Sequence, residues 1–126
     1  MDSVIFGYLI DKNILFEINE KKLIQYQIET QTQPFFFKVI ALNETQSRLL
    51  AYFLENRKVD LIDKDVILKN VWEDFSLSSS NQRLWQTVND LKKKLSYFGL
   101  EDGFIRNIHG SGYIIDNSKV LELFSR

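Results

Sequence analysis

The chain lacks cysteine altogether and has a single histidine, His109, among its 126 residues. Disulfide bonds and thiolate metal sites are therefore excluded, and one histidine gives no basis for a metal centre. No apolar run approaches the roughly 20 residues that a membrane-spanning helix needs, so we expect no membrane contact within this chain. The N-terminus carries Asp2 and no basic segment, which argues against a secretory signal. We therefore expect a soluble, cytoplasmic protein.

Patterns that carry catalysis are also missing. Carboxylates are scattered over turns and helix starts, and no nucleophile stands beside a base at a recognisable spacing. Gly110 and Gly112 form a Gly-x-Gly, but no strand and helix flank it as a phosphate-binding loop requires. We predict a protein that is not an enzyme and has no cofactor and no metal.

An excess of positive charge, the usual mark of a nucleic-acid-binding protein, is lacking too. The net charge is −1, which by itself indicates no nucleic-acid partner. The distribution is more favourable, because the stretch from Gln82 to Tyr113 holds five basic and three acidic residues. Positive charge is thus sparse, but it is concentrated in the stretch from Gln82 to Tyr113.

The first third of the chain has the pattern of a small sheet. Four β-rich runs are separated by polar turns, and the only proline, Pro34, precedes the last of them. The runs are Val4–Phe6, Ile14–Phe16, Leu23–Ile28 and Phe35–Ile40. We predict a four-stranded antiparallel sheet within residues 1–41, packed on helices through one face.

Residues 42–98 are predicted to hold three helices. Asn43 with Gln46 has the pattern of a capping box, and Asp63 can cap a second helix. Residues 59–62 are expected to be an extended link between them. The apolar positions of the first helix are Leu49, Leu50, Phe53 and Leu54, and those of the second are Ile67, Leu68, Val71 and Trp72.

The third predicted helix follows a cap at Ser80 or Asn81 and has two contrasting sides. Leu84, Val88, Leu91 and Leu95 recur at helical spacing and form one apolar stripe. The opposite side and its flanks carry amide, cationic and aromatic groups, namely Gln82, Arg83, Trp85, Gln86, Asn89, Lys92 and Lys93. Amides and cations are the side chains that contact base edges and phosphates.

Two short apolar runs at Phe104–Ile105 and Tyr113–Ile115 enclose the polar segment 106–112. They predict a glycine-tipped β-hairpin within residues 103–116. Residues 121–124 are expected to form a final turn or to fray. A helix rich in amides followed by such a hairpin is the layout of a winged helix. We therefore predict an α+β winged helix-turn-helix fold, formed by one domain over residues 1–126.

Four motifs in this order resemble the OmpR/PhoB-type winged-helix DNA-binding domain. Each is weak alone, but the four in register are specific. They are Leu42-Asn43-x-x-Gln46 with Leu49-Leu50, Ile67-Leu68-x-x-Val71-Trp72, Val88-x-x-Leu91-Lys92-Lys93-Lys94-Leu95, and Ile108-x-Gly110-x-Gly112-Tyr113. The resemblance covers most of the chain up to Ile115. It implies a bacterial transcription regulator that binds double-stranded promoter DNA.

Because the predicted strands begin at Val4, we expect no receiver domain before them, and the chain looks more like the ToxR/CadC subgroup. Members of that subgroup carry this domain in the cytoplasm, ahead of a transmembrane helix. The chain is then either a fragment of such a regulator or a stand-alone one. The family also implies a contact between RNA polymerase and the loop 73–80, through Phe75 and Leu77, and self-association on tandem half-sites.

We expect the third helix to lie in the major groove and the hairpin to reach the adjacent minor groove or its backbone. Gln82, Gln86 and Asn89 are candidates for base edges. The full set of expected DNA-binding residues is Asn81, Gln82, Arg83, Trp85, Gln86, Thr87, Asn89, Lys92, Lys93, Arg106, His109, Ser111 and Tyr113.

Several roles stay open at this stage. Trp85 either packs at the edge of the stripe or faces DNA, Tyr113 either packs inside or bonds a phosphate, and Phe75 with Leu77 either contacts a partner or folds back on Trp72. His109 and Asp90 stand where relatives often carry basic residues, and this weakens the expected attraction for phosphate. His109 is expected to add a positive charge to the hairpin as the pH falls, strengthening DNA binding modestly.

The alternative function is a winged helix that binds a partner protein instead of DNA. The acidic pI and Asp90 favour it, whereas the amide-rich helix and the hairpin oppose it. Salt dependence separates the two, because phosphate contacts release counterions.

Overall fold

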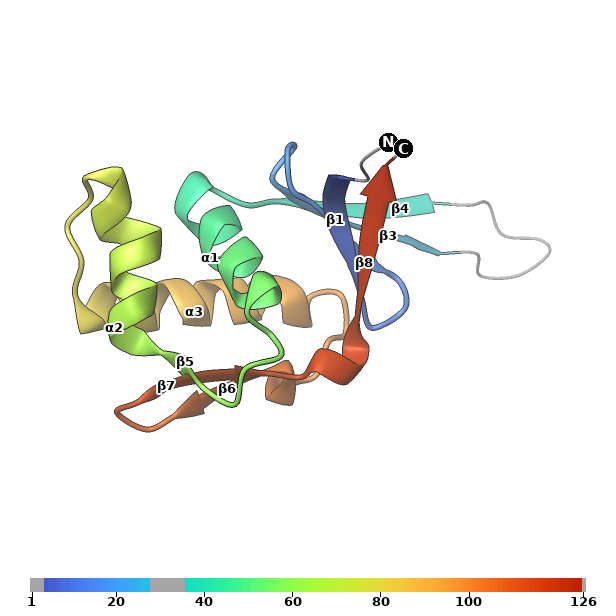
Figure 1. Cartoon of the computed structure of the whole chain (residues 1–126). Helices are drawn as coiled ribbons and strands as arrows, with labels where there is room; N and C mark the ends of the chain where they lie inside the picture. The colour runs from blue at the N-terminus through green and yellow to red at the C-terminus, as the bar shows by residue number, and fades with distance from the viewer. Residues whose placement is uncertain (1–3, 28–35, 126) are drawn as a thin grey trace.

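The computed structural model describes residues 4–27 and 36–125. Within them, five strands form an antiparallel sheet in the order β4-β3-β2-β1-β8 (Figure 1). The strands are β1 Val4–Ile10, β2 Ile14–Glu17, β3 Lys22–Gln27, β4 Phe36–Ala41 and β8 Val120–Ser125. The first four confirm the predicted sheet; positions 28 and 35, at the ends of two predicted runs, lie outside the described residues.

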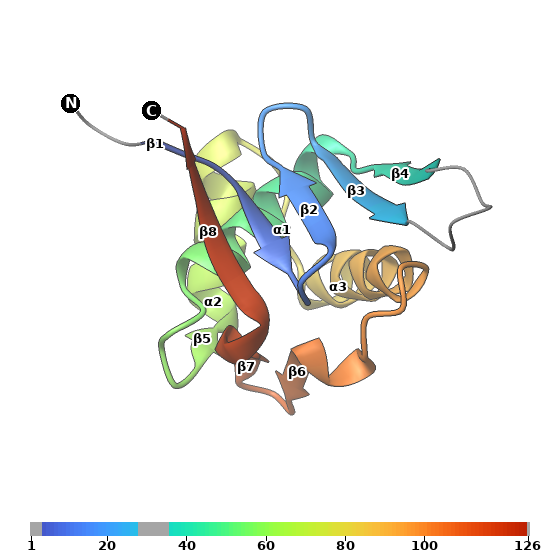
Figure 2. The ribbon, with the colours of Figure 1, turned by 90° about the vertical axis from the view of Figure 1, so that its right-hand side faces the viewer.

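Strand β8 corrects the prediction of a final turn or frayed end at residues 121–124. It pairs antiparallel with β1, from Val4 opposite Ser125 to Ile10 opposite Val120 (Figure 2). Arg57, which follows helix α1, also bonds to β8: its Nη2 donates to Oε1 of Glu122 at 3.0 Å. A six-residue strand whose partner lies at the other end of the sequence leaves almost no local signal, which explains the error.

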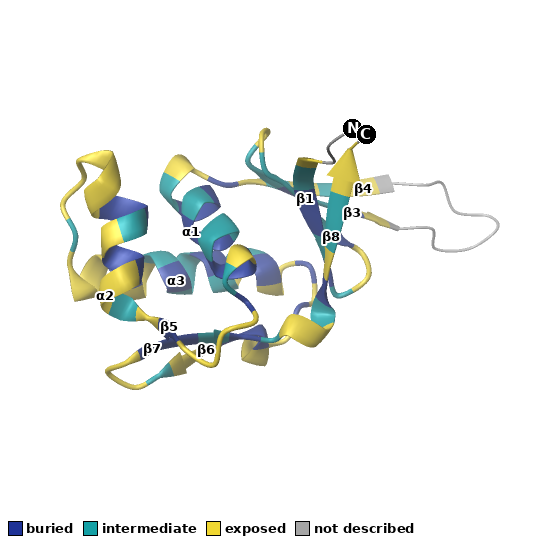
Figure 3. Ribbon diagram, viewed as in Figure 1, coloured by how far each residue is buried: buried dark blue, intermediate teal, exposed yellow. Residues whose placement is uncertain are grey.

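The sheet buries one face against the helices, as its alternating side chains require. Tyr8, Ile10, Ile14, Phe16 and Leu23 point inward and are almost completely buried. They join the helical side chains in one core cluster. Figure 3 colours the buried positions of the strands and helices dark blue.

Helix α1, Glu44–Glu55, follows the predicted capping box. Asn43 Oδ1 accepts from the Gln46 backbone N at 2.8 Å, and Gln46 Oε1 accepts from the Asn43 backbone N at 3.1 Å. The four predicted apolar residues of this helix are buried, so its inner face is confirmed.

The second helical segment is less regular than predicted. Asp63 caps α2, Lys64–Ile67, which continues as a π-helical turn η1, Leu68–Trp72, and a 3-10 turn η2, Glu73–Phe75. The predicted inner face is confirmed, because Ile67, Leu68, Val71 and Trp72 are all buried. Helix α3, Asn81–Ser96, then runs beneath α1 with its apolar stripe inward (Figure 1).

The predicted hairpin consists of β6, Ile105–Ile108, and β7, Gly112–Ile115. In the described residues it belongs to a sheet of order β5-β7-β6, because part of the predicted link forms β5, Ile62–Asp63. Gly112 faces this strand so closely that a Cβ would collide with the carbonyl oxygen of Ile62. Gly110 has a φ of +75°, which favours glycine at the hairpin tip. Both glycines are thus required by the hairpin geometry.

Candidate nucleic-acid interface

Helix α3 begins at a side-chain cap that fixes its register. Ser80 Oγ accepts from the Arg83 backbone N at 3.0 Å, which settles the choice between Ser80 and Asn81. The stripe Leu84, Val88, Leu91 and Leu95 is buried, so the polar side must face outward. The exposed predicted residues on α3 are Asn81, Gln82, Arg83, Trp85, Gln86 and Lys93, and the half-buried ones are Thr87, Asn89 and Lys92.

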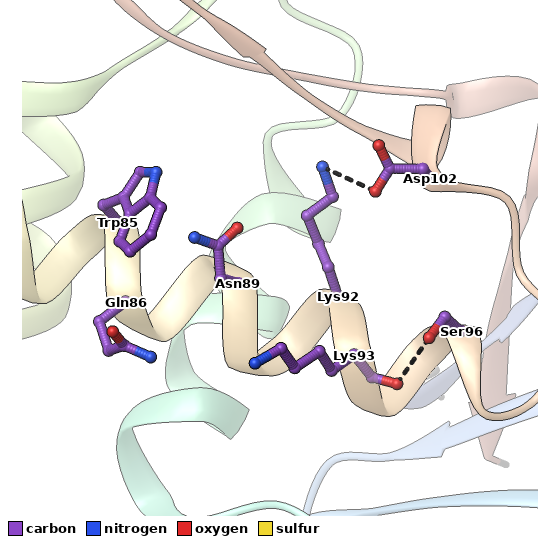
Figure 4. Close-up of a pocket in the computed structure, with 7 residues that line it drawn as sticks. All are labelled: Trp85, Gln86, Asn89, Lys92, Lys93, Ser96 and Asp102. Atoms are coloured by element: carbon purple, nitrogen blue, oxygen red, sulfur yellow. Dashed lines mark hydrogen bonds and ion pairs between the residues drawn. The ribbon is translucent and has the colours of Figure 1, made fainter.

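A shallow hollow of about 370 Å³ runs along this outer face. Figure 4 shows Trp85, Gln86, Asn89 and Lys93 projecting from consecutive turns of α3, with Lys92 reaching towards Asp102. Trp85 is 54% exposed, whereas Trp72 is 3% exposed. The sequence left open whether Trp85 packs at the edge of the apolar stripe or faces outward, and in the structure it faces outward. Trp72 is confirmed as a core residue.

A second hollow, of about 150 Å³, joins the start of α3 to the hairpin. Asn81 and Trp85 line it from the helix, and Asn107 and Ser111 line it from the hairpin. Asn107 was not predicted as a site residue. It pairs with Tyr113 in the ladder between β6 and β7, and the shared hollow places it beside Asn81 and Trp85 of α3.

The hairpin presents Arg106, His109 and Ser111 to solvent, as predicted. Tyr113 differs, since it is 5% exposed and its ring centroid lies 5.5 Å from that of Phe53. Burial raises its pKa above the ordinary tyrosine value. The sequence left open whether Tyr113 packs inside or bonds a phosphate, and in the structure it packs inside. Tyr113 therefore supports the hairpin from within the core.

The cations of α3 differ in how freely they can meet a phosphate. Lys92 Nζ lies 3.2 Å from Asp102 Oδ1. Lys94 Nζ donates to the Ala41 carbonyl oxygen at 2.9 Å and to Gln46 Oε1 at 2.8 Å, so it ties α3 to the start of α1. In the described part of the chain, Arg83 and Lys93 make no such bond and project freely.

Three polar side chains of the outer face bond to α3 itself. Ser96 Oγ donates to the Lys93 carbonyl oxygen at 2.8 Å. Gln86 Nε2 donates to Asp90 Oδ1 at 3.0 Å, one helical turn further on. Thr87 Oγ1 donates to the Arg83 carbonyl oxygen at 2.8 Å. The Thr87 hydroxyl oxygen can still accept a bond, but its proton is already engaged.

Phe75, at the end of η2, is 51% exposed, and Leu77, in the loop that follows it, is 42% exposed. The Arg48 guanidinium of α1 lies 3.6 Å from the centre of the Phe75 ring. Phe75 therefore stacks on a cation at the surface, whereas the alternative was that it folds back on Trp72. Leu77 approaches Trp72 through its backbone N, which donates to the Trp72 carbonyl oxygen at 3.0 Å.

Within residues 4–27 and 36–125, no group of three or more histidine, cysteine, aspartate or glutamate side chains is arranged to hold a metal ion. Within the same residues, no helix is long and apolar enough to cross a membrane.

The family model described as "Transcriptional regulatory protein, C terminal" matches residues 38–115, which include the helices and the hairpin. The chain belongs to this family. Its fold is similar to that of the DNA-binding domain of Escherichia coli CadC, with a TM-score of 0.69 and 16% identity over 97% of this chain and 100% of that one. It is also similar to the DNA-binding domain of the response regulator AdeR in complex with an intercistronic region, with a TM-score of 0.63 and 16% identity over 86% of this chain and 99% of that one. No curated protein matches the sequence.

Membership in this transcriptional regulatory family confirms the winged-helix fold and its OmpR/PhoB type. The protein is a DNA-binding transcription regulator, and it is not an enzyme.

Proposed function

We propose that α3 lies in the major groove and that the β6–β7 hairpin reaches the adjacent minor groove or its backbone. The observation that carries this proposal is the continuous outer surface formed by the two hollows. Trp85 lines both of them, so the amide-bearing face of α3 runs directly into the hairpin. An α-helix fits the major groove, and an exposed hairpin beside it meets the flanking backbone.

The side chains of this outer surface divide into two roles. Gln82, Gln86 and Asn89 contact base edges, because side-chain amides match the donor and acceptor pattern of adenine. The others hold phosphates and sugars and set the register of the protein on the duplex. These are Asn81, Arg83, Lys92, Lys93, Arg106, His109 and Ser111, with Trp85 packing on sugar or a thymine methyl group. Thr87 joins them when its hydroxyl leaves the Arg83 carbonyl oxygen and donates to a phosphate instead.

Fluorescence anisotropy with promoter-length duplexes at low and moderate salt tests this assignment. The triple variant Gln86→Ala/Asn89→Ala/Lys93→Ala is expected to lose salt-sensitive binding. Asn19→Ala/Lys58→Ala removes an amide and a cation from exposed positions outside α3 and the hairpin, and it should bind like the wild type. Equal binding by all three proteins would place the DNA elsewhere, and no binding by the wild type would favour the alternative, a module for protein partners.

We also propose that the loop 73–80 contacts RNA polymerase. The exposed Phe75 and Leu77 support this, because the Arg48 guanidinium holds the Phe75 ring at the surface. Phe75→Ala/Leu77→Ala should keep DNA affinity and lose activation in a reconstituted transcription assay. Loss of both would mean that the loop serves DNA binding, and loss of neither would exclude the polymerase contact.

Self-association on tandem half-sites is a further part of the proposal. Sedimentation with duplexes carrying one or two half-sites should show one and two bound copies, with the second binding more tightly than the first. We further propose a cytoplasmic location, because the DNA partner lies there. The domain is either a stand-alone regulator or the cytoplasmic part of a membrane-anchored one, and localisation of the full-length protein distinguishes these two cases.

A further inference from the structure

We propose that Asp90 positions the Gln86 side chain and thereby selects the base that α3 contacts at this point. This inference rests on the proposed placement of α3 in the major groove. Its starting observation is the 3.0 Å bond from Gln86 Nε2 to Asp90 Oδ1 on the outer face of the helix.

The chemistry of the pair fixes which end of the amide faces Asp90. An ionised carboxylate only accepts hydrogen bonds, so it can bond the NH2 group of Gln86 but not its oxygen. Turning the amide over would place Oε1 against the carboxylate oxygens. The order of oxygen and nitrogen at Gln86 is therefore set by Asp90.

The bond to Asp90 uses one of the two hydrogens on Nε2. Gln86 keeps the second hydrogen and the lone pairs of Oε1, and it is exposed at the edge of the hollow in Figure 4. This remaining pair, one donor beside one acceptor, complements adenine, which presents an N6 donor and an N7 acceptor in the major groove. Guanine presents O6 and N7, two acceptors, and would set O6 against Oε1. We therefore infer that Gln86 selects adenine.

Asp90 also carries a cost that a positioning role explains. A negative charge on a surface that faces phosphates weakens binding to every DNA sequence alike. The nearest cations one turn further along α3 are Lys93, which projects into the hollow, and Lys94, whose nitrogen is bonded to Ala41 and Gln46. Asp90 thus lowers the affinity for all DNA while it sharpens the choice of base. Specificity is the difference between the affinities for the preferred sequence and for other sequences, so it can rise although general affinity falls.

The test begins with selection of the preferred site from a random duplex library by the wild type. Affinities are then measured on that site and on duplexes changed at each position, for wild type, Gln86→Ala, Asp90→Ala, Asp90→Asn and Asp102→Asn. Gln86→Ala identifies the base pair that Gln86 contacts. The wild type should prefer adenine there by roughly ten-fold or more.

The two Asp90 variants should change that preference in different ways. Asp90→Ala frees the amide to turn, so the preference for adenine should fall at that base pair alone. Asp90→Asn can donate to Gln86 Oε1 and turn the NH2 group towards the base, which should shift the preference towards guanine. Both should bind unrelated DNA more tightly than the wild type, because a negative charge is lost.

Asp102→Asn is the matched control, since it removes the same charge from the edge of the same hollow without touching Gln86. It should raise general affinity and keep the choice of adenine. If both Asp90 variants instead raise affinity evenly and leave every base preference as in the wild type, Asp90 acts only as a charge and this inference is overturned. A wild type that binds no DNA would overturn the proposed function itself.

Discussion

Lys92 Nζ lies 3.2 Å from a carboxylate oxygen of Asp102, so one basic side chain of α3 is neutralised before any DNA arrives. Asp102 is largely exposed, and exposed ion pairs are worth at most about 1 kcal/mol. A phosphate can therefore compete for Lys92. The pair lowers the effective positive charge of the proposed DNA-binding surface without blocking it.

Replacing Asp102 should release that charge. We expect Asp102→Asn to bind DNA several-fold more tightly and to steepen the slope of log affinity against log salt by up to about 0.9, the value for one added phosphate contact. Glu101→Gln is the control, because it removes the same charge from the neighbouring residue. Glu101 pairs with Lys119 and not with Lys92, so this variant should leave the slope nearly unchanged. Equal slopes for both variants and the wild type would show that Lys92 does not reach the DNA.

The contact between Gly112 and β5 predicts a loss of stability. Gly112→Ala would push a Cβ into the Ile62 carbonyl, and backbone on both sides leaves little room to relax. We expect it to lower the free energy of unfolding by about 1–3 kcal/mol, measured by denaturant titration. Gly103→Ala has open space around its added Cβ and should change the stability by well under 1 kcal/mol.

The ion pair between Arg57 and Glu122 should hold β8 to the helices. The Arg57 side chain is 8% exposed, so removing its partner leaves a buried charge. We expect Glu122→Ala to cost about 1–3 kcal/mol, because Glu122 is itself 31% exposed. Lys69 and Asp74 form an exposed pair, and Asp74→Ala should cost much less. A double-mutant cycle with Arg57→Met measures the coupling, and a coupling near zero would contradict this account.

The two tryptophans should behave in opposite ways. Trp72→Ala empties a buried site and should destabilise the protein by about 3–5 kcal/mol in thermal or chemical unfolding. Trp85→Ala should leave the stability almost unchanged and weaken DNA binding, because the side chain stands outward between the two hollows. A Trp85 variant that unfolds readily yet binds DNA normally would reverse the assignment.

The features that the sequence predicted well are those that neighbouring residues decide. The capping box at Asn43 and Gln46 closes within one turn, and the leucine stripe of α3 follows from helical spacing alone. The outward face of α3 followed from the same pattern.

The features that escaped prediction depend on partners distant in sequence. The strand β5 exists because Ile62 pairs with Tyr113, and Asn107 joins the proposed site through the register of the hairpin. The pairing of Lys92 with Asp102 depends on where the turn after α3 places a carboxylate. Ile62 and Tyr113 are far apart in the sequence, and hydrophobic periodicity does not specify how the turn after α3 and the hairpin place Asp102 and Asn107.

The pairing of β8 with β1 has a consequence for how the protein folds during its synthesis. β1 is synthesised well before β8, but its neighbour on one side includes Ser125, which lies opposite Val4. Until that residue has left the ribosome, one edge of β1 remains unpaired, and an open strand edge is a template for wrong pairing. Contacts between such distant residues also slow folding. Within residues 4–125, the sheet whose strands are begun first is therefore completed last.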